Sequence, residues 1–126
     1  MIRFRGVLQV CILLTSVHAA AFAADQSAGS GREIFEIRCA GCHEVVPPAT
    51  RTLGPSLVGI IGRKAGTGDT GVHSRAAVES GIVWDRQSLR RFLSDPGREI
   101  PGTIMPVRVE DPRELDALLN YLETLR

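Results

Sequence analysis

The segment Cys39-Ala40-Gly41-Cys42-His43 places two cysteines three positions apart and a histidine directly after them. On one helical turn the two thiols face the same side of the chain. They can then add to the two vinyl groups of a haem, and the following histidine lies under the iron as an axial ligand. Because this chemistry needs all three residues at this spacing, the motif predicts covalent attachment of one c-type haem at Cys39, Cys42 and His43.

Two other interpretations of the cysteine pair are weaker. A structural zinc site needs four protein ligands, and after residue 23 the chain offers two cysteines, two histidines and no second pair. A redox-active pair of the thioredoxin type needs a strand–helix–strand context. No run of alternating apolar and polar residues is long enough to predict strands.

Residues 1–23 are typical of a secretory signal peptide. Two arginines near the start precede a short apolar run over residues 7–17, and small residues then form a cleavage site. We expect cleavage after Ala23, with cleavage after Ala24 as the alternative, which leaves residues 24–126 as one domain. The apolar run is interrupted and too short to span a bilayer comfortably, which disfavours a retained anchor. The predicted location is the bacterial periplasm.

The charge composition of the chain argues against some classes of binding partner. The chain has 15 basic and 14 acidic residues, and two of the basic residues, Arg3 and Arg5, lie in the predicted signal peptide. The remaining domain is slightly acidic, which does not suggest binding to nucleic acid or to an anionic membrane. Aromatic residues are only 5% of the chain, so a covalently attached porphyrin would supply much of the apolar bulk of a small core. We expect a monomer without a transmembrane segment.

Helix-start signals predict four helices, because a serine or aspartate N-cap stands before each one. The expected helices cover residues 31–41 after Ser30, 75–80 after Ser74, 86–94 after Asp85, and the segment from Pro112 onward after Asp111. A capping box pairs Ser30 with Glu33. Pro96-Gly97 is expected to stop the third helix.

The last predicted helix has one apolar face, formed by leucines at spacings of three and four. These are Leu115, Leu118, Leu119, Leu122 and Leu125.

The glycine-rich stretch over residues 54–71 predicts loops and tight turns. Long loops are unusual in a helical bundle, but they are expected if they surround a haem. The predicted fold class is all-α, with about four helices and long loops wrapped around one covalently bound haem.

A six-coordinate haem needs a second axial ligand. Apart from Met1, the chain contains only Met105 as a thioether donor, between Pro101 and Pro106. A lone methionine is usually a core residue, but this stiff, extended segment favours a ligand loop. We therefore predict His43 and Met105 as the two ligands of the iron.

With these residues in place, the chain resembles the class I c-type cytochromes, in particular the small soluble bacterial ones that are similar to mitochondrial cytochrome c. The resemblance runs from Gly31 to Tyr121. Its marks are Gly31, Phe35, the Cys39–His43 motif, residues 54–59, residues 62–66, Trp84, Pro101-Gly102-Thr103, Met105 and Tyr121.

The resemblance implies a cytochrome c fold in which the first and last helices cross nearly at right angles. It implies that Gly31 permits this close crossing, with Phe35, Leu118 and Tyr121 around it. It also assigns supporting roles around the haem. The Pro55 carbonyl would accept the proton of the second ring nitrogen of His43.

Three further residues would contact the haem by resemblance. Arg63 and Trp84 would approach the buried propionates, which offsets the cost of burying their charge. Thr103 would lie near the inner propionate or the ligand loop. The proposed cofactor contacts are therefore Cys39, Cys42, His43, Met105, Pro55, Arg63, Trp84 and Thr103, and none of them is expected to be catalytic.

The chain also departs from the family pattern. His73 stands where the family often has tyrosine, and two interpretations stay open: a contact to a propionate, or a solvated loop histidine. Phe92 replaces a tyrosine whose hydroxyl meets the methionine sulfur, and Ala77 replaces a polar side chain. The ring of lysines that docks mitochondrial partners is not reproduced, so the identity of the partners does not transfer.

The resemblance and the predicted ligands favour an electron carrier of a respiratory chain over an enzyme. A filled coordination sphere leaves no place for substrate, so one electron would pass to and from transient redox partners. One alternative is a peroxidase or gas-binding haem protein with a labile methionine, although only Arg108 lies near Met105 as a candidate catalytic group. The other alternative is a haem subunit of a larger oxidoreductase.

Overall fold

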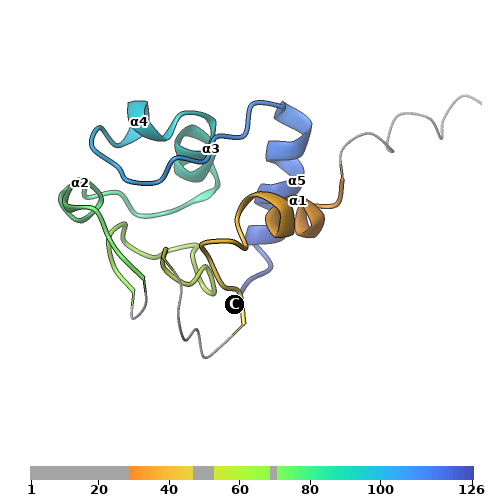
Figure 1. The fold of residues 1–126 in the computed structure, drawn as a ribbon, viewed down its shortest axis with the longest axis horizontal. Coiled ribbons are helices and arrows are strands. Elements are labelled where there is room, and N and C mark those ends of the chain that lie inside the picture. The colour runs from red at the N-terminus through yellow and green to blue at the C-terminus, as the bar shows by residue number, and fades with distance from the viewer. Residues whose placement is uncertain (1–28, 47–52, 69–70) are drawn as a thin grey trace, which may run out of the picture.

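The computed structural model describes residues 29–46, 53–68 and 71–126. Within these ranges the chain forms five α-helices and no strand (Figure 1). The helices are α1 (Gly31–Arg38), α2 (Arg75–Glu79), α3 (Arg86–Ser94), α4 (Pro96–Glu99) and α5 (Pro112–Leu122). The predicted signal peptide lies outside the described residues. None of the helices in the described ranges has the length and apolar character needed to cross a membrane.

The predicted N-caps are confirmed. The Ser30 hydroxyl accepts from the backbone N–H of Glu33, whose carboxylate accepts from the N–H of Ser30 over 2.6 Å. Ser74 accepts from Ala77 at the start of α2. Asp85 and Asp111 cap α3 and α5 in the same way. Each cap satisfies backbone donors that the first helical turn leaves unpaired.

The region after α3 differs from the prediction. Pro96-Gly97 ends α3 as expected, but the same residues begin the additional short helix α4. Proline is well suited to the first helical position, where its missing N–H is not needed. Asp95 supplies the cap, because its carboxylate accepts from the N–H of Arg98. The fold therefore has five helices where four were expected.

Helix α1 packs directly against α5, and these two helices make the most extensive helix–helix contact in the described chain (Figure 1). Their approach depends on Gly31, because a Cβ there would overlap the Ala117 carbonyl and lie 2.7 Å from the Cβ of Tyr121. The Phe35 and Tyr121 rings pack with centroids 5.7 Å apart. The predicted role of Gly31 at the crossing is confirmed.

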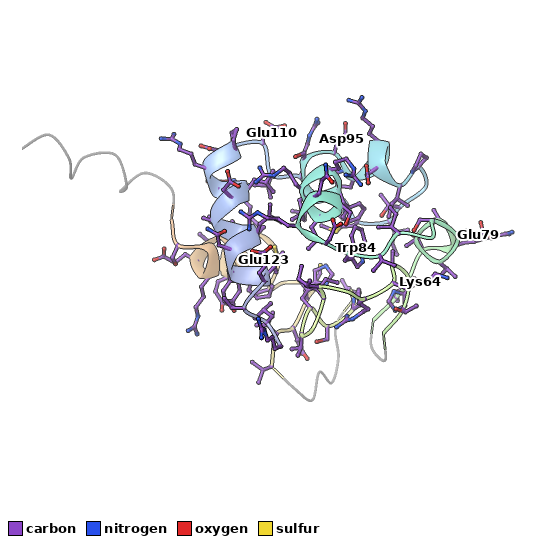
Figure 2. All side chains as sticks on the ribbon, turned by 180° about the vertical axis from the view of Figure 1, so that it is seen from behind. Lys64, Glu79, Trp84, Asp95, Glu110 and Glu123 are labelled. Carbon is purple, nitrogen blue, oxygen red and sulfur yellow. The ribbon has the colours of Figure 1, made fainter. Side chains whose placement is uncertain are left out.

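The core is mainly aliphatic and lies between α1, α3 and α5. Four leucines of the predicted apolar face are buried on α5, and two of these, Leu118 and Leu119, are completely inaccessible to solvent. The fifth, Leu125, follows α5 and is only partly buried. Leu89, Phe92 and Leu93 of α3 are also buried. Figure 2 shows Trp84 within the molecule, whereas Glu79 and Glu110 lie at its edge.

Within the described residues, the connection between α1 and α2 makes backbone hydrogen bonds to the segment before α3. An isolated antiparallel bridge joins Lys64 to Val83. Beside it, the N–H of Trp84 donates to the Arg63 carbonyl over 2.9 Å, and the N–H of Gly62 donates to the Trp84 carbonyl over 2.7 Å. These contacts bring the glycine-rich loop against the segment before α3, and both then line one cavity.

Candidate functional site

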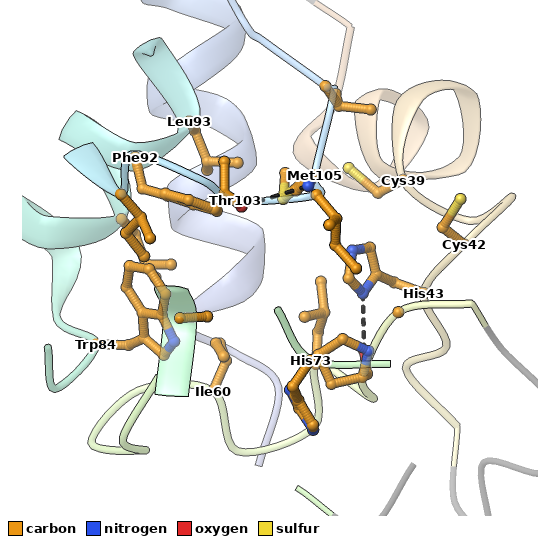
Figure 3. Close-up of a pocket in the computed structure, with 18 of the residues that line it drawn as sticks. Cys39, Cys42, His43, Ile60, His73, Trp84, Phe92, Leu93, Thr103 and Met105 are labelled. Atoms are coloured by element: carbon orange, nitrogen blue, oxygen red, sulfur yellow. Dashed lines mark hydrogen bonds between the residues drawn. The ribbon is translucent and has the colours of Figure 1, made fainter. Parts of the chain in front are cut away.

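A cavity of about 540 Å³ opens in the middle of the described chain (Figure 3). Its wall is mostly apolar, as expected of a pocket for a large, flat organic group. All eight predicted cofactor-contact residues line it: Cys39, Cys42, His43, Pro55, Arg63, Trp84, Thr103 and Met105. The fold therefore brings together side chains from four separate segments, which the sequence predicted as one site.

The ring of His43 is fixed from one side. Its Nδ1 lies 2.7 Å from the Pro55 carbonyl oxygen. A carbonyl only accepts, so Nδ1 carries the hydrogen and donates it. The ring nitrogen Nε2 on the opposite side is then left with a free lone pair, which is the form that binds a metal. This contact, expected from the resemblance, is present in the structure.

The backbone of Gly54 packs closely against the His43 ring. A Cβ added there would lie 2.7 Å from Nδ1 and 2.9 Å from Nε2 of His43, closer than carbon atoms approach in folded proteins. The absence of a side chain lets the Pro55 carbonyl reach the imidazole. From the sequence, Gly54 was expected in a loop and among the marks of the resemblance. Its steric role could not be predicted, because it arises from a contact with a residue eleven positions earlier.

Both thiols of the motif are free, and Cys39 is buried. Burial raises the pKa of the Cys39 thiol to about 11, because desolvation disfavours the thiolate. Zinc binds the thiolate, so this environment disfavours a zinc site and suits a neutral thiol. No group of three or more potential metal-binding His, Cys, Asp or Glu side chains occurs in the described ranges.

Met105 lies on a loop that is fixed at both ends. Ile100, just after α4, is 2% exposed, and Val109 is 1% exposed. The N–H of Val109 also donates to the Leu93 carbonyl of α3 over 2.9 Å. Between these anchors the N–H of Met105 donates to the Thr103 hydroxyl over 3.3 Å. The thioether is thus held at the cavity by a loop with little freedom.

Arg63 and Trp84 are neighbours because of the backbone contacts described above. The Trp84 ring packs on Phe92 with centroids 5.0 Å apart. The Arg63 guanidinium lines the cavity and also donates to the carbonyls of Ser56 and Val58. These loop contacts could not be predicted from the sequence, because nothing in the local pattern links Arg63 to those carbonyls.

His73 and Ala77, the two departures near α2, also line the cavity. The Nε2 atom of His73 is buried. The residue as a whole is partly exposed, and both interpretations of His73 stay predictions. The rim of the cavity also includes three exposed aliphatic residues for which the sequence predicts no role: Leu53, Val72 and Ile104.

The family model for cytochrome c matches residues 28–126. The chain belongs to the cytochrome c family. Cytochrome c2 from Blastochloris viridis is 37% identical over 102 residues, which are 80% of this chain and 80% of that protein. Cytochrome c2 from Agrobacterium tumefaciens (strain II Chrys) is 43% identical over 89 residues, 68% of this cytochrome and 80% of the relative.

A solved structure supports the same fold for this cytochrome. Cytochrome cH from Methylobacterium extorquens superposes with a TM-score of 0.68 at 36% identity, covering 77% of this chain and 97% of that chain. The resemblance stated from the sequence and the all-α cytochrome c fold are thereby confirmed. The protein is a small c-type cytochrome that carries electrons, and its cofactor is covalently bound haem c.

The residues of this cytochrome fit that cofactor. Two free thiols lie on one side of the cavity, and the lone pair of His43 is available because Nδ1 is engaged. Met105, which follows the cysteine motif by more than sixty residues in the sequence, lines the same cavity. The apolar wall suits a porphyrin.

Proposed function

We propose that this protein is a periplasmic single-haem carrier that moves one electron at a time between a donor and an acceptor protein of a respiratory or dehydrogenase system. The predicted signal peptide over residues 1–23 supports export to the periplasm. Cys39 and Cys42 hold the cofactor through thioethers, and His43 and Met105 are its axial ligands. The observation that carries the proposal is that Met105, which is far along the sequence from Cys39, Cys42 and His43, lines the same apolar cavity as they do.

Haem c, when bound, supplies an iron that accepts and releases one electron. The residues of the chain set the conditions for that exchange. Pro55 keeps the hydrogen of His43 on Nδ1, which orients the ring and raises the basicity of Nε2. The anchored loop presents the soft sulfur of Met105, and histidine–methionine ligation raises the potential.

Arg63, Trp84 and Thr103 stabilise the polar edge of the cofactor in this proposal. A buried carboxylate is costly unless a cation or donor faces it, and Arg63 supplies a cation on the cavity wall. Trp84 contributes an indole from the segment that is hydrogen-bonded to the Arg63 backbone. Thr103 holds the ligand loop through its hydroxyl.

The rim explains how electrons enter and leave. Leu53, Val72 and Ile104 line the cavity and are 71%, 59% and 61% exposed. An apolar rim allows a partner to approach closely without displacing tightly bound water. We expect small, short-lived contacts there, as is typical of electron-transfer complexes.

The peroxidase alternative needs an acid–base group beside the sixth coordination position. Arg108, the nearest candidate in sequence, does not line the cavity; its Nε donates to the Ser94 carbonyl over 2.9 Å. Its guanidinium also lies 3.6 Å from the Asp95 carboxylate. Since these contacts direct Arg108 toward α3, the geometry favours the carrier.

The ligand assignment is tested with Met105→Ala and with Ile104→Ala as the matched control in the adjacent position. The oxidised protein should show the weak charge-transfer absorption band that marks sulfur on ferric iron. Met105→Ala should lose this band and bind cyanide readily, whereas Ile104→Ala should keep the band. An unchanged band in Met105→Ala would exclude Met105 as a ligand.

The attachment site is tested with the double variant Cys39→Ser/Cys42→Ser. Haem should remain in the protein precipitate when the wild-type protein is treated with acidic acetone, and it should be extracted from the variant. Haem that stays covalently attached to the variant would refute the site.

Amino-terminal sequencing of the exported protein tests the signal peptide, and a start at Met1 would contradict cleavage after Ala23 or Ala24.

A further inference from the structure

The rim of the cavity is formed by exposed apolar residues from three segments of the chain. Leu53, Val72 and Ile104 line the cavity and are each more than half exposed. Pro106, directly after Met105, is also exposed and lines the cavity. Exposed apolar groups that gather at one place on a protein mark a surface that another molecule covers. The rim therefore indicates an interaction surface.

The three segments are neighbours in the fold. The N–H of Val72 donates to the Leu53 carbonyl over 2.8 Å, so these two residues lie side by side. The loop that carries Ile104 adjoins α2, because a Cβ at Gly102 would be 3.3 Å from the Cβ of Ala76. Helix α2 begins three residues after Val72. The apolar residues therefore surround the mouth of one cavity and are not scattered over the molecule.

The rim segments carry no formal charge. Residues 53–57, 71–74 and 102–107 contain no Lys, Arg, Asp or Glu, although the whole chain has 15 basic and 14 acidic residues. Arg51 and Asp69, the charged residues that precede two of these segments in the sequence, have opposite signs and lie outside the described residues. A surface of this composition produces little electric field in front of the cavity.

Described cations close to the rim segments in sequence, or on the cavity wall, already have partners. Three of them pair with carboxylates: Arg38 with Glu114 over 2.7 Å, Arg75 with Glu79 over 2.7 Å, and Arg108 with Asp95 over 3.6 Å. The Arg63 guanidinium donates to two backbone carbonyls. Exposed paired charges exert little force beyond their own contact, because water and salt screen them. The rim thus offers apolar contact and little charge attraction.

Resting on the proposed function, we propose that the rim docks a redox protein whose own docking face is apolar and uncharged around its cofactor. Burial of apolar surface stabilises such a complex, and salt does not screen this contribution. Association and electron transfer therefore depend little on ionic strength. A carrier that docked through a ring of cations would behave differently, because charge steering raises association rates about tenfold or more and falls steeply as salt is added.

A lipid surface fits the rim less well than a protein does. Segments that lie on membranes bury a continuous apolar helix face and carry lysine or arginine on the polar side. The rim instead combines residues from three loops, and its segments contain no lysine or arginine. The rim also surrounds the cavity proposed for haem, so a molecule seated there lies beside the redox group.

The first test uses small redox probes of opposite charge with the purified holoprotein. Hexacyanoferrate(III) is an anion and tris(phenanthroline)cobalt(III) is a cation, and each takes one electron from the ferrous protein. Rate constants are measured by stopped flow at ionic strengths from about 0.02 to about 0.5 M, and both should change by less than about twofold. Slopes of opposite sign for the two probes, with a change of about fivefold or more, would show a charged rim and overturn the inference.

The second test uses a second copy of the holoprotein as a redox partner with an apolar rim. Electron exchange between ferric and ferrous protein is measured from NMR line broadening. Ile104→Lys and, separately, Leu53→Lys should slow this exchange at least about fivefold at low salt, because two like charges then meet at the contact. The variant Leu53→Lys lies outside the loop that carries Met105, so its effect does not depend on that ligand.

Val83→Lys is the matched control for the rim variants. It adds the same charge at a side chain that is 55% exposed and does not line the cavity. It should change the exchange rate by less than about twofold, because salt screens a charge far from the contact. Equal slowing in Val83→Lys and in the rim variants would show that electrons do not pass at the rim, and would overturn the inference.

Two further measurements identify other occupants of the rim. Binding of the holoprotein to neutral phosphatidylcholine vesicles would assign the rim to a lipid surface. A stable dimer at micromolar concentration in analytical ultracentrifugation, lost in Ile104→Lys, would assign the rim to a permanent interface. Either result would overturn the inference while haem attachment and electron transfer stand. An exported protein without covalent haem would overturn the proposed function itself.

Discussion

Gly54 lies against the imidazole of His43 so closely that a Cβ would be 2.7 Å from Nδ1. The imidazole cannot shift away from Gly54, because its Nδ1 is also hydrogen-bonded to the carbonyl of Pro55, the residue that follows Gly54. A glycine and a carbonyl together therefore fix one axial ligand, and the requirement for glycine is steric.

Gly54→Ala should push the His43 ring away from Pro55. Overpacking of this kind typically costs about 1–3 kcal/mol of stability. We expect a lower urea midpoint for the holoprotein and a changed NMR shift of the His43 Nδ1 hydrogen. Gly97→Ala is the control, because a Cβ at Gly97 meets nothing within 4 Å. A Gly54→Ala protein with the wild-type His43 spectrum would show that the ring is not confined.

Gly31→Ala should separate α1 from α5. Helix propensity alone favours alanine over glycine by about 1 kcal/mol. The added Cβ would nevertheless overlap the Ala117 carbonyl, and backbone cannot move aside as cheaply as a flexible side chain. Urea unfolding should show a net loss of about 1–3 kcal/mol. Equal or higher stability than the wild type would mean that the crossing tolerates a methyl group.

Val109→Ala should loosen the loop that carries Met105. The side chain is 1% exposed, and removing two methyl-sized groups at about 0.8 kcal/mol each should also leave a small cavity. On heating, the sulfur–iron absorption band should disappear at a lower temperature than in the wild type. Val83→Ala makes the same change at a side chain that is 55% exposed and should leave the band unaffected.

Asp116 should make the stability of the α3–α5 contact depend on pH. Its hydrogen bond from Arg90, aided by the charge of Arg86, holds the pKa of this carboxyl below its ordinary value of 3.8. A lowered pKa in the fold means that the ionised form stabilises the protein. The contribution is therefore complete above a pH of about 4 and is lost as the pH falls through the folded pKa.

The Asp116→Asn variant should unfold at a lower urea concentration than the wild type at neutral pH. The difference should be small, since these side chains are partly exposed, and it should shrink as the pH is lowered below about 4. Glu36→Gln, on the exposed side of α1, serves as the control. A difference that stays constant between neutral and acidic pH would assign the effect of Asp116 to something other than its charge.

The sequence was most informative where a signal is local. The N-caps Ser30, Ser74, Asp85 and Asp111 begin four helices because each cap satisfies donors within its own first turn. The attachment motif predicts its chemistry for the same reason, since its three residues lie on one turn. Helix α4 was missed because Pro96 is read equally well as the end of one helix and the start of another.

Other parts of the site could not be predicted because they depend on distant contacts. The hydrogen bonds from Arg63 to Ser56 and Val58 follow from the path of a glycine-rich loop, and no local pattern specifies that path. Gly71 packs so closely against Gly54 that a Cβ there would overlap its backbone, and no local pattern predicts this contact. In such cases the sequence supplies the residue type, and the tertiary contact decides its role.

The α1–α5 crossing has a consequence for the order of events during biogenesis. Arg38, at the end of α1, pairs with Glu114 of α5 across a separation of 76 residues. Helix α1 therefore cannot dock on α5 until the chain has been synthesised almost to its end. The cysteine motif directly follows α1, so the packing beside the motif is completed only when the last helix is available.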